Sequence, residues 1–199
     1  MTRKLTVRDI SDLRAYERER ADFHSRVLAL KRVRRVQVGP FVTLTFENSD
    51  TVRFQVQEMA RVERMMRDDQ IQEELDIYNP LIPDPGQLCA TMFLELTNDE
   101  ELREWLPKLT GIERSVEVRI GEGDGAVRVA GTVNAEHAEL LTRDQVTAAV
   151  HYLYFDVGQG LAERFRRGPV SLAVVHPAYT YQTELPDETK ASLLEDVAG

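Results

Sequence analysis

Residues 78–86 read Tyr78-Asn79-Pro80-Leu81-Ile82-Pro83-Asp84-Pro85-Gly86 and lie between a charged helical pattern and an apolar run. The three prolines leave this segment few backbone conformations, because each proline fixes its own φ and restricts the residue before it. Tyr78, Leu81 and Ile82 are apolar enough to anchor the segment in a core. We therefore expect a stiff corner that presents neighbouring groups accurately, as a binding site requires.

Upstream of this corner, apolar residues recur at helical spacing over residues 7–32, which predicts one long helix or a short helix followed by a long one. Apolar and polar residues then alternate over residues 36–38, 42–46 and 52–56, which predicts a three-stranded antiparallel meander. The helical pattern returns over residues 57–76, so a second long helix is expected to follow the meander.

Downstream, alternating and β-branched stretches predict further strands, and a short C-terminal helix is expected to start near Pro186. The pattern as a whole predicts an α+β fold with a largely antiparallel sheet. We expect a single domain over residues 1–199; the alternative is two lobes, residues 1–86 and 87–199. The predicted strands are residues 87–96, 116–120, 127–129, 146–157, 170–175 and 179–185, with helices at 98–109 and 161–167.

Composition limits the class of protein. The chain has 199 residues, 42% of them hydrophobic and 30% charged, which is ordinary for a globular protein. No apolar run reaches the roughly 18–20 residues of a membrane span, and the N-terminus lacks an apolar signal core. Cys89 is the only cysteine, so no intrachain disulfide forms. We expect a cytoplasmic protein with no membrane partner and an inert, buried thiol.

Charge is unevenly spread along the chain. Residues 1–40 hold eleven Lys/Arg and five Asp/Glu, whereas residues 41–199 hold fourteen and twenty-nine. The basic part is densest at Lys31-Arg32-Val33-Arg34-Arg35. Three interpretations remain: a nucleic-acid arm, cations at a helix C-terminus, and docking against the acidic remainder, within the chain or across a dimer. The overall net charge of −9 opposes a phosphate backbone, so we expect no nucleic-acid partner.

Two groups of residues are candidates for a ligand-binding site. Glu58 and Arg61 follow an apolar alternating stretch and are expected near the corner at Tyr78 and Asn79, where an arginine can hold an anionic ligand. The competing interpretation is a set of solvated surface ion pairs. His176 and Tyr179 form a second group on a sharp turn, where the imidazole can transfer protons or the turn can simply join two strands.

Metal chemistry has one local candidate, the group Glu136, His137 and Glu139. Neighbours this close in a loop rarely all face one point, whereas a metal site needs three or four convergent ligands. His176 is a further isolated candidate. Gly121–Gly125 has the composition of a phosphate loop but is followed by a strand pattern, which indicates a hairpin turn. No cofactor is assigned.

Several segments together resemble a bacterial family of about 200 residues that is known as a numbered domain of unknown function. The segments that carry the resemblance are residues 7–32, Phe54-Gln55-Val56-Gln57-Glu58-Met59, the corner at residues 78–83, Ala149-Val150-His151-Tyr152-Leu153 and His176-Pro177-Ala178-Tyr179. Genes of that family lie near those for rubrerythrin-like and iron–sulfur proteins. The resemblance implies a part in redox or oxidative-stress metabolism, and it implies no catalytic residues.

These observations lead to three hypotheses. The first is an accessory or interaction protein that forms a homo-oligomer and serves a redox-protein partner. The second is a small-molecule-binding protein or enzyme with its pocket near Glu58, Arg61, Tyr78 and Asn79. The third is metal binding through histidines. A concave pocket with convergent polar groups favours the second, and a large exposed apolar patch favours the first.

Overall fold

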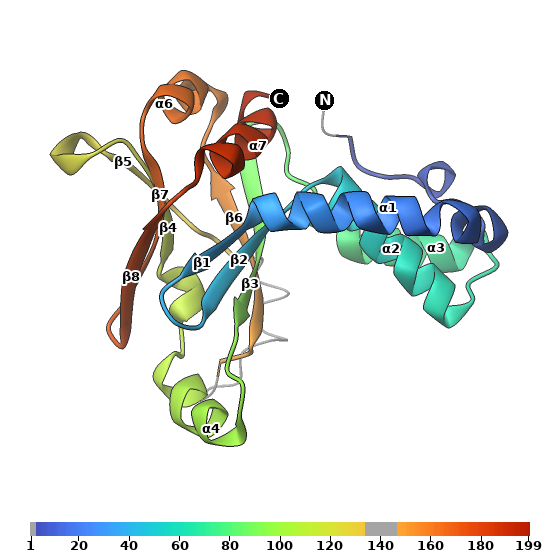
Figure 1. Ribbon diagram of the computed structural model, residues 1–199, viewed down its shortest axis with the longest axis horizontal. Coiled ribbons are helices and arrows are strands. Elements are labelled where there is room, and N and C mark those ends of the chain that lie inside the picture. The colour runs from blue at the N-terminus through green and yellow to red at the C-terminus, as the bar shows by residue number, and fades with distance from the viewer. Residues whose placement is uncertain (1–2, 134–146) are drawn as a thin grey trace.

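A computed structural model describes residues 3–133 and 147–199 of the chain. Two antiparallel sheets pack against each other, and a group of helices extends from one side of them (Figure 1). The predicted α+β class with antiparallel pairing is confirmed. We call the sheet nearer these helices sheet A and the other one sheet B.

The first sheet, sheet A, has the strand order β1-β2-β3-β6, and sheet B has the order β5-β4-β7-β8. Each neighbouring pair is antiparallel. The strands of sheet A are β1 (Arg35–Val38), β2 (Val42–Glu47), β3 (Gln87–Leu94) and β6 (Val150–Asp156). The strands of sheet B are β4 (Val116–Ile120), β5 (Val127–Ala130), β7 (Val170–His176) and β8 (Tyr179–Glu184).

The main core lies between the two sheets. Alternate residues of β2, such as Leu44 and Phe46, face alternate residues of β7, such as Leu172 and Val174, within one cluster of buried side chains. Helices close the ends of this sandwich: α7 (Asp187–Ala198) and α6 (Ala162–Arg167) lie at one end and α4 (Asp99–Lys108) at the other (Figure 1). The sandwich therefore uses one face of sheet A and leaves the other face to the remaining helices.

These remaining helices form a body that we call the helical arm. It comprises η1 (Val7–Asp9), α1 (Leu13–Arg34), α2 (Ser49–Glu63), α3 (Asp68–Tyr78) and η2 (Asn79–Leu81). Among the two forms predicted for residues 7–32, the short helix followed by a long one is the one observed. The arm has small apolar clusters of its own, which hold α1, α2 and α3 together.

The prediction of a three-stranded meander is wrong, because residues 52–56 lie in α2, and of the three predicted strands only the first two, β1 and β2, form and pair. Val52 and Val56 fit both a strand period and a helix period, since they are four residues apart. Asn48 decides between the two, because its side chain accepts hydrogen bonds from the backbone amides of Asp50 and Thr51 at 3.1 and 3.0 Å. This N-cap satisfies free amides of the first turn and starts the helix there.

The second long helix, predicted over residues 57–76, is in fact part of two helices. Arg64 takes a left-handed conformation with φ of 54° and ends α2. Its backbone amide still reaches the carbonyls of the preceding turn, as in a normal C-terminal cap. The turn lets α3 fold back beside α2, so that Ile71 and Leu75 pack on Val56 and Ala60.

The proline corner is pinned, as the sequence predicts. Leu81 and Ile82 are buried, and the side chain of Asn79 binds both backbone groups of Leu5, at 2.8 Å and 2.9 Å. Gly86 joins the corner to the C-terminal helix through the carbonyl of Asp196. The chain then enters β3, which pairs with β2, so sheet A contains strands from both sides of residue 86.

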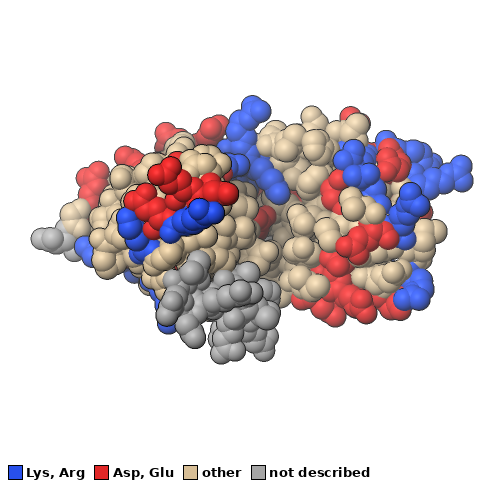
Figure 2. All heavy atoms as spheres, turned by 90° about the horizontal axis from the view of Figure 1, so that it is seen from below, with Lys and Arg blue, Asp and Glu red and all other residues tan. Residues whose placement is uncertain are grey.

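Part of the basic N-terminal segment pairs with carboxylates of the same chain. Arg20 pairs with Glu58 and Arg35 pairs with Glu95, while Arg53 and Arg61, which follow the segment, pair with Glu19 and Glu58. Seen from below, the arm accordingly shows lysine and arginine side chains interspersed with aspartate and glutamate (Figure 2). Of the three interpretations of the basic segment, docking against acidic residues within the chain therefore accounts for several of its charges.

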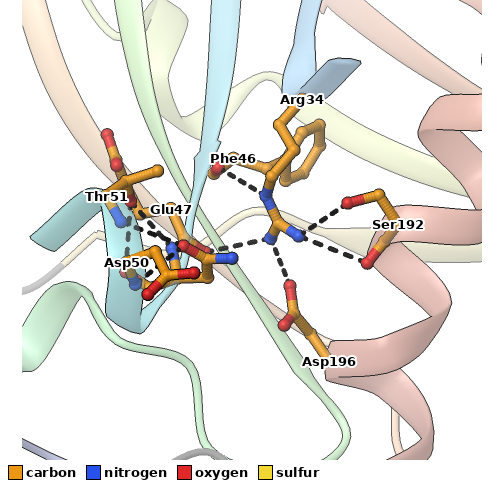
Figure 3. Close-up of polar contacts among 8 residues, drawn as sticks. Arg34, Phe46, Glu47, Asp50, Thr51, Ser192 and Asp196 are labelled. Atoms are coloured by element: carbon orange, nitrogen blue, oxygen red, sulfur yellow. Dashed lines mark hydrogen bonds and ion pairs between the residues drawn. The ribbon is translucent and has the colours of Figure 1, made fainter. Parts of the chain in front are cut away.

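Arg34 differs from the other basic residues of this segment because it is fully buried, at the end of α1 (Figure 3). Its guanidinium donates to the carbonyls of Phe46 and Glu47 at the end of β2 and to Ser192 on α7, and it pairs with the carboxylate of Asp196. One side chain thus joins the arm, sheet A and the C-terminal helix.

In the described part of the chain, no helix combines the length and the apolar character that crossing a membrane requires.

We expect Arg34→Met to lower the free energy of unfolding by about 3–5 kcal/mol, because it leaves Asp196 as an uncompensated buried charge. Urea denaturation measures the change. Arg14→Met is the matched control, since Arg14 is exposed on the same helix, and it should change stability by less than about 0.5 kcal/mol. Equal effects of the two substitutions would contradict the role assigned to Arg34.

Candidate functional site

The outer face of sheet A is polar but is not left open to solvent. In β2, Val42, Leu44 and Phe46 face the core, and the alternate residues Thr43 and Thr45 face outward. All residues of β2 are nevertheless buried, because α1 and α2 pass over the outer face. A strand with two covered faces, one of them polar, needs partners for its hydroxyl and carboxyl groups.

Strand register sets these polar groups in a row across the sheet. Arg35, Thr45, Thr91 and Tyr152 are successive cross-strand neighbours on β1, β2, β3 and β6. Glu47 lies on the same face, two residues beyond Thr45 along β2, and its Oε1 accepts a hydrogen bond of 2.7 Å from the hydroxyl of Thr91. The middle of the row therefore lies beside a carboxylate that one threonine holds in place.

A hollow lies above this row, between sheet A and the arm. It consists of two adjoining cavities of about 200 and 440 Å³ that share Lys31, Glu47 and Phe93, and we call them together the groove. The view from below looks toward the hollow, with basic side chains along its upper edge (Figure 2). The other lining residues are Thr51, Val52, Gln55, Tyr78, Leu81, Thr91, Val150 and Tyr152 in the first cavity, and Leu28, Arg32, Arg35 and Thr45 in the second.

Charges of opposite sign come from different elements around the groove. Lys31, Arg32 and Arg35 come from the end of α1 and the start of β1, whereas Glu47 comes from the sheet. Arg35 pairs with Glu95, but neither Lys31 nor Arg32 is within ion-pair distance of a carboxylate anywhere in residues 3–133 or 147–199. The groove thus offers two uncompensated cations and one buried carboxylate.

The predicted pair of Glu58 and Arg61 is formed, with 3.2 Å between Arg61 Nη2 and Glu58 Oε2. Glu58 also accepts from the hydroxyl of Tyr16 at 2.6 Å and from Arg20 at 2.8 and 2.9 Å. All these partners belong to α1 and α2. The carboxylate is thereby fully engaged in joining the two helices.

This environment lowers the pKa of Glu58 to about 2. The largest cause is the hydrogen bond from Arg20, and the bonds from Tyr16 and Arg61 act in the same direction against the effect of burial. Burial and the neighbouring carboxylate raise the pKa of the Tyr16 phenol. Both shifts keep Glu58 ionised and Tyr16 protonated, which preserves the bond between them.

The other predicted site residues lie in two further places. Tyr78 lines the groove, and its neighbour Asn79 is occupied by its hydrogen bonds to Leu5. Tyr179 lies at the start of β8 in sheet B, and its hydroxyl donates to the carbonyl of Val38 on β1 at 2.7 Å. His176 contacts the carbonyl of Thr110 at 3.3 Å. Only Tyr78 of the six predicted residues is therefore a lining residue of the groove.

The described residues contain no group of three or more side chains placed to hold a metal ion. The candidate residues Glu136, His137 and Glu139 lie outside the described ranges. Glu113 and His151 are buried, and Glu113 Oε2 has no hydrogen-bond partner in the described structure. Burial lowers the pKa of His151, which favours its neutral form.

The comparisons with known proteins agree with this fold. The model of a family described as "Protein of unknown function (DUF3501)" matches residues 4–197. The chain belongs to this family. The crystal structure of a novel protein of unknown function from Burkholderia pseudomallei K96243 is similar over 98% of this chain and 100% of that one, with 34% identity and a TM-score of 0.87. No curated protein matches the chain.

Membership in the DUF3501 family confirms the predicted resemblance and supplies no site residues. The groove has to be found from geometry instead. Sequence reasoning singled out Lys31 and Arg32 for their charge and Tyr78 for its corner, but it missed Thr45, Glu47 and Thr91. The sequence feature that could have indicated these residues is their alternation with apolar residues in β2 and β3. This alternation predicts a polar face of the sheet but does not predict whether helices cover that face.

We expect Glu58→Gln to reduce stability at neutral pH and to flatten its dependence on pH. Because the folded pKa is below the ordinary 4.5, the stabilisation is present above about pH 4.5 and is lost as pH falls toward 2. Glu58 is partly exposed, so we expect a loss of about 1–3 kcal/mol at pH 7. Urea denaturation between pH 2 and 7 measures it.

Glu63→Gln is the control for this experiment, because Glu63 is exposed on the same helix and makes no ion pair within the described residues. A wild-type acid profile that Glu58→Gln leaves unaltered would show that Glu58 does not stabilise the interface of α1 and α2.

Proposed function

We propose that this protein binds a small polar molecule in the groove on the outer face of sheet A. One observation carries the proposal. Two uncompensated cations, Lys31 and Arg32, and a buried carboxylate, Glu47, line the same concave space without forming an ion pair. Concave sites with a few convergent polar groups are the usual form of small-molecule sites. No reaction is assigned to the groove.

The energetics of burial support this reading of the groove. A buried carboxylate is costly unless hydrogen bonds compensate for its lost hydration, and Thr91 supplies one such bond to Glu47. Lys31 is half-buried, and its ammonium lies 5.8 Å from the centre of the Phe54 ring rather than against a carboxylate. A ligand that pairs with these groups gains charge-assisted hydrogen bonds in a partly desolvated place, where they are stronger than in water.

The walls of the groove provide apolar contact as well. Phe93, Val150 and Leu81 line it together with Tyr78 and Tyr152. Tyrosines combine an apolar ring with a polar hydroxyl, so they can pack on a carbon skeleton while facing a wet cavity. A combined space of a few hundred Å³ suits a metabolite of modest size rather than a folded partner.

A thermal-shift screen of small polar metabolites tests the proposal. We expect some compounds to raise the melting temperature of the wild-type protein, and we expect Lys31→Met and Glu47→Gln each to abolish the shift, because each removes a charged partner from the groove. Arg103→Met and Glu100→Gln on α4 make the same charge changes at exposed positions outside the groove and should keep the shift.

Shifts that persist in both groove variants would place the ligand elsewhere and reject the proposal. So would a library in which no compound stabilises the wild-type protein.

We also propose a second role, that of an accessory protein that forms a homodimer through the tip of the arm. Val62 and Met66 are 66% and 81% exposed there, beside a mainly apolar cavity of about 450 Å³. Exposed apolar side chains next to an apolar cavity favour contact with another chain. The family resemblance implies a redox pathway, and in this role the partner supplies the redox chemistry. Cys89 is unsuited to it because the residue is buried and burial raises the pKa of its thiol.

Light scattering coupled to size exclusion tests this second role. We expect a dimer of the wild-type chain in low and high salt, since apolar contacts are not screened, and a monomer for Val62→Glu combined with Met66→Glu. Val175→Glu is the control, because Val175 is also exposed but lies on β7. A wild-type protein that stays monomeric at all concentrations would exclude self-association.

A further inference from the structure

We infer that the ligand of the groove is a small zwitterion, a molecule that carries an ammonium group at one end and a carboxylate, phosphate or sulfonate at the other. The inference rests on the proposed function, because it names the class of molecule that the same groove takes. It follows from where the opposite charges of the groove lie and from what each of them already binds.

The Glu47 end of the groove selects a cationic donor. Glu47 is 9% exposed, and its Oε1 is occupied by the hydroxyl of Thr91. Oε2 accepts no hydrogen bond from any residue in the described ranges. A carboxylate in this state accepts a hydrogen bond most strongly from a charged donor, and it repels an anion that enters the groove.

The Lys31 end selects an anion. Lys31 and Glu47 line both cavities, whereas Arg32 and Arg35 line only the larger one, so basic side chains are in excess there. Only Arg35 is partly neutralised, through its ion pair with Glu95, which Thr43 also holds by a hydrogen bond of 2.9 Å. This end keeps a net positive charge after that pairing, so it attracts an anion and opposes an isolated amine.

The two ends do not neutralise each other directly. Lys31 and Glu47 line the same cavity, yet they are farther apart than ion-pair distance. A simple anion meets the repulsion of Glu47, and a simple amine meets that of the three basic side chains. A molecule with both charges can bind both kinds of group, and its carbon chain can pack on Phe93 and Val150, which line the same cavity.

Two matched sets of probes test the inference on the full-length chain by isothermal titration and by amide chemical shifts. The first set is O-phosphoethanolamine, ethyl phosphate and ethanolamine. The second is 4-aminobutyrate, butyrate and butylamine. Each zwitterion is compared with molecules that keep only one of its charged ends. We expect the zwitterion of at least one set to bind at least about tenfold more tightly than both of its half-molecules.

Variants assign the two ends separately. We expect Glu47→Gln to reduce the affinity for the zwitterion to about that of the anionic half-molecule, and Lys31→Met to reduce it to about that of the amine. Glu100→Gln and Arg103→Met should leave it unaltered. Circular dichroism melts verify that each variant folds. If Glu47→Gln does not fold, the inference is still tested by Lys31→Met, a substitution of a half-buried residue, which should lower the affinity for the zwitterion to that of the amine.

The outcomes separate this inference from the proposed function. If ethyl phosphate or butyrate binds as tightly as its zwitterion and loses affinity in Lys31→Met, the groove binds anions, the proposed function stands and the zwitterion is rejected. If no probe binds while other compounds from the metabolite screen bind in the groove, the zwitterion is again rejected alone. If neither probes nor screen compounds perturb the groove residues, both are rejected.

Discussion

The guanidinium of Arg34 is the interaction on which the arrangement of arm and sheets depends. It occupies a place where α1, the end of β2 and α7 meet, and it binds backbone carbonyls of the strand together with Asp196 of the helix (Figure 3). Burial raises the pKa of Asp196, and the neighbouring Arg34 guanidinium opposes this change. An ion pair of this kind contributes less to net stability than to choosing one arrangement, because any other arrangement leaves a buried charge without a partner.

The position of Arg34 also determines where Lys31 and Glu47 lie on the two sides of the groove. Lys31 is one helical turn before Arg34, so the rotation of α1 that buries the guanidinium places Lys31 toward the outer face of sheet A. On the other side, the backbone carbonyl of Glu47 accepts from Arg34 while its side chain turns to Thr91 and the groove. The uncompensated lysine and the buried glutamate are therefore positioned by the same buried arginine. The groove is in this sense a consequence of how the arm is attached.

The sequence was sufficient for the class of fold, for the long first helix and for the pinned corner, because proline chemistry and apolar spacing act locally. It failed at residues 52–56, where Val52 and Val56 satisfy two periods and the Asn48 cap decides. It also failed to gather the site. Glu58 looked like a ligand group because it is charged beside an apolar pattern, but only the packing of α1 on α2 shows that Arg20 and Tyr16 already engage it. Conversely, the alternation over residues 42–46 predicts a strand with one polar face, and the value of those polar residues in the groove depends on helices elsewhere in the chain.

The two acidic residues Glu58 and Glu47 show what distinguishes a structural charge from a binding charge. Glu58 has donors for both oxygens, from Tyr16 and two arginines, and all of them lie in helices that must stay together. A ligand can bind there only by breaking bonds that hold the arm. Glu47 has one oxygen engaged and one available, and neither Lys31 nor Arg32 is within ion-pair distance of a carboxylate of the described chain. A ligand can bind there by adding bonds while the fold keeps its own. That difference in unused hydrogen-bonding capacity, rather than charge or burial alone, is the physical reason for placing the site on sheet A.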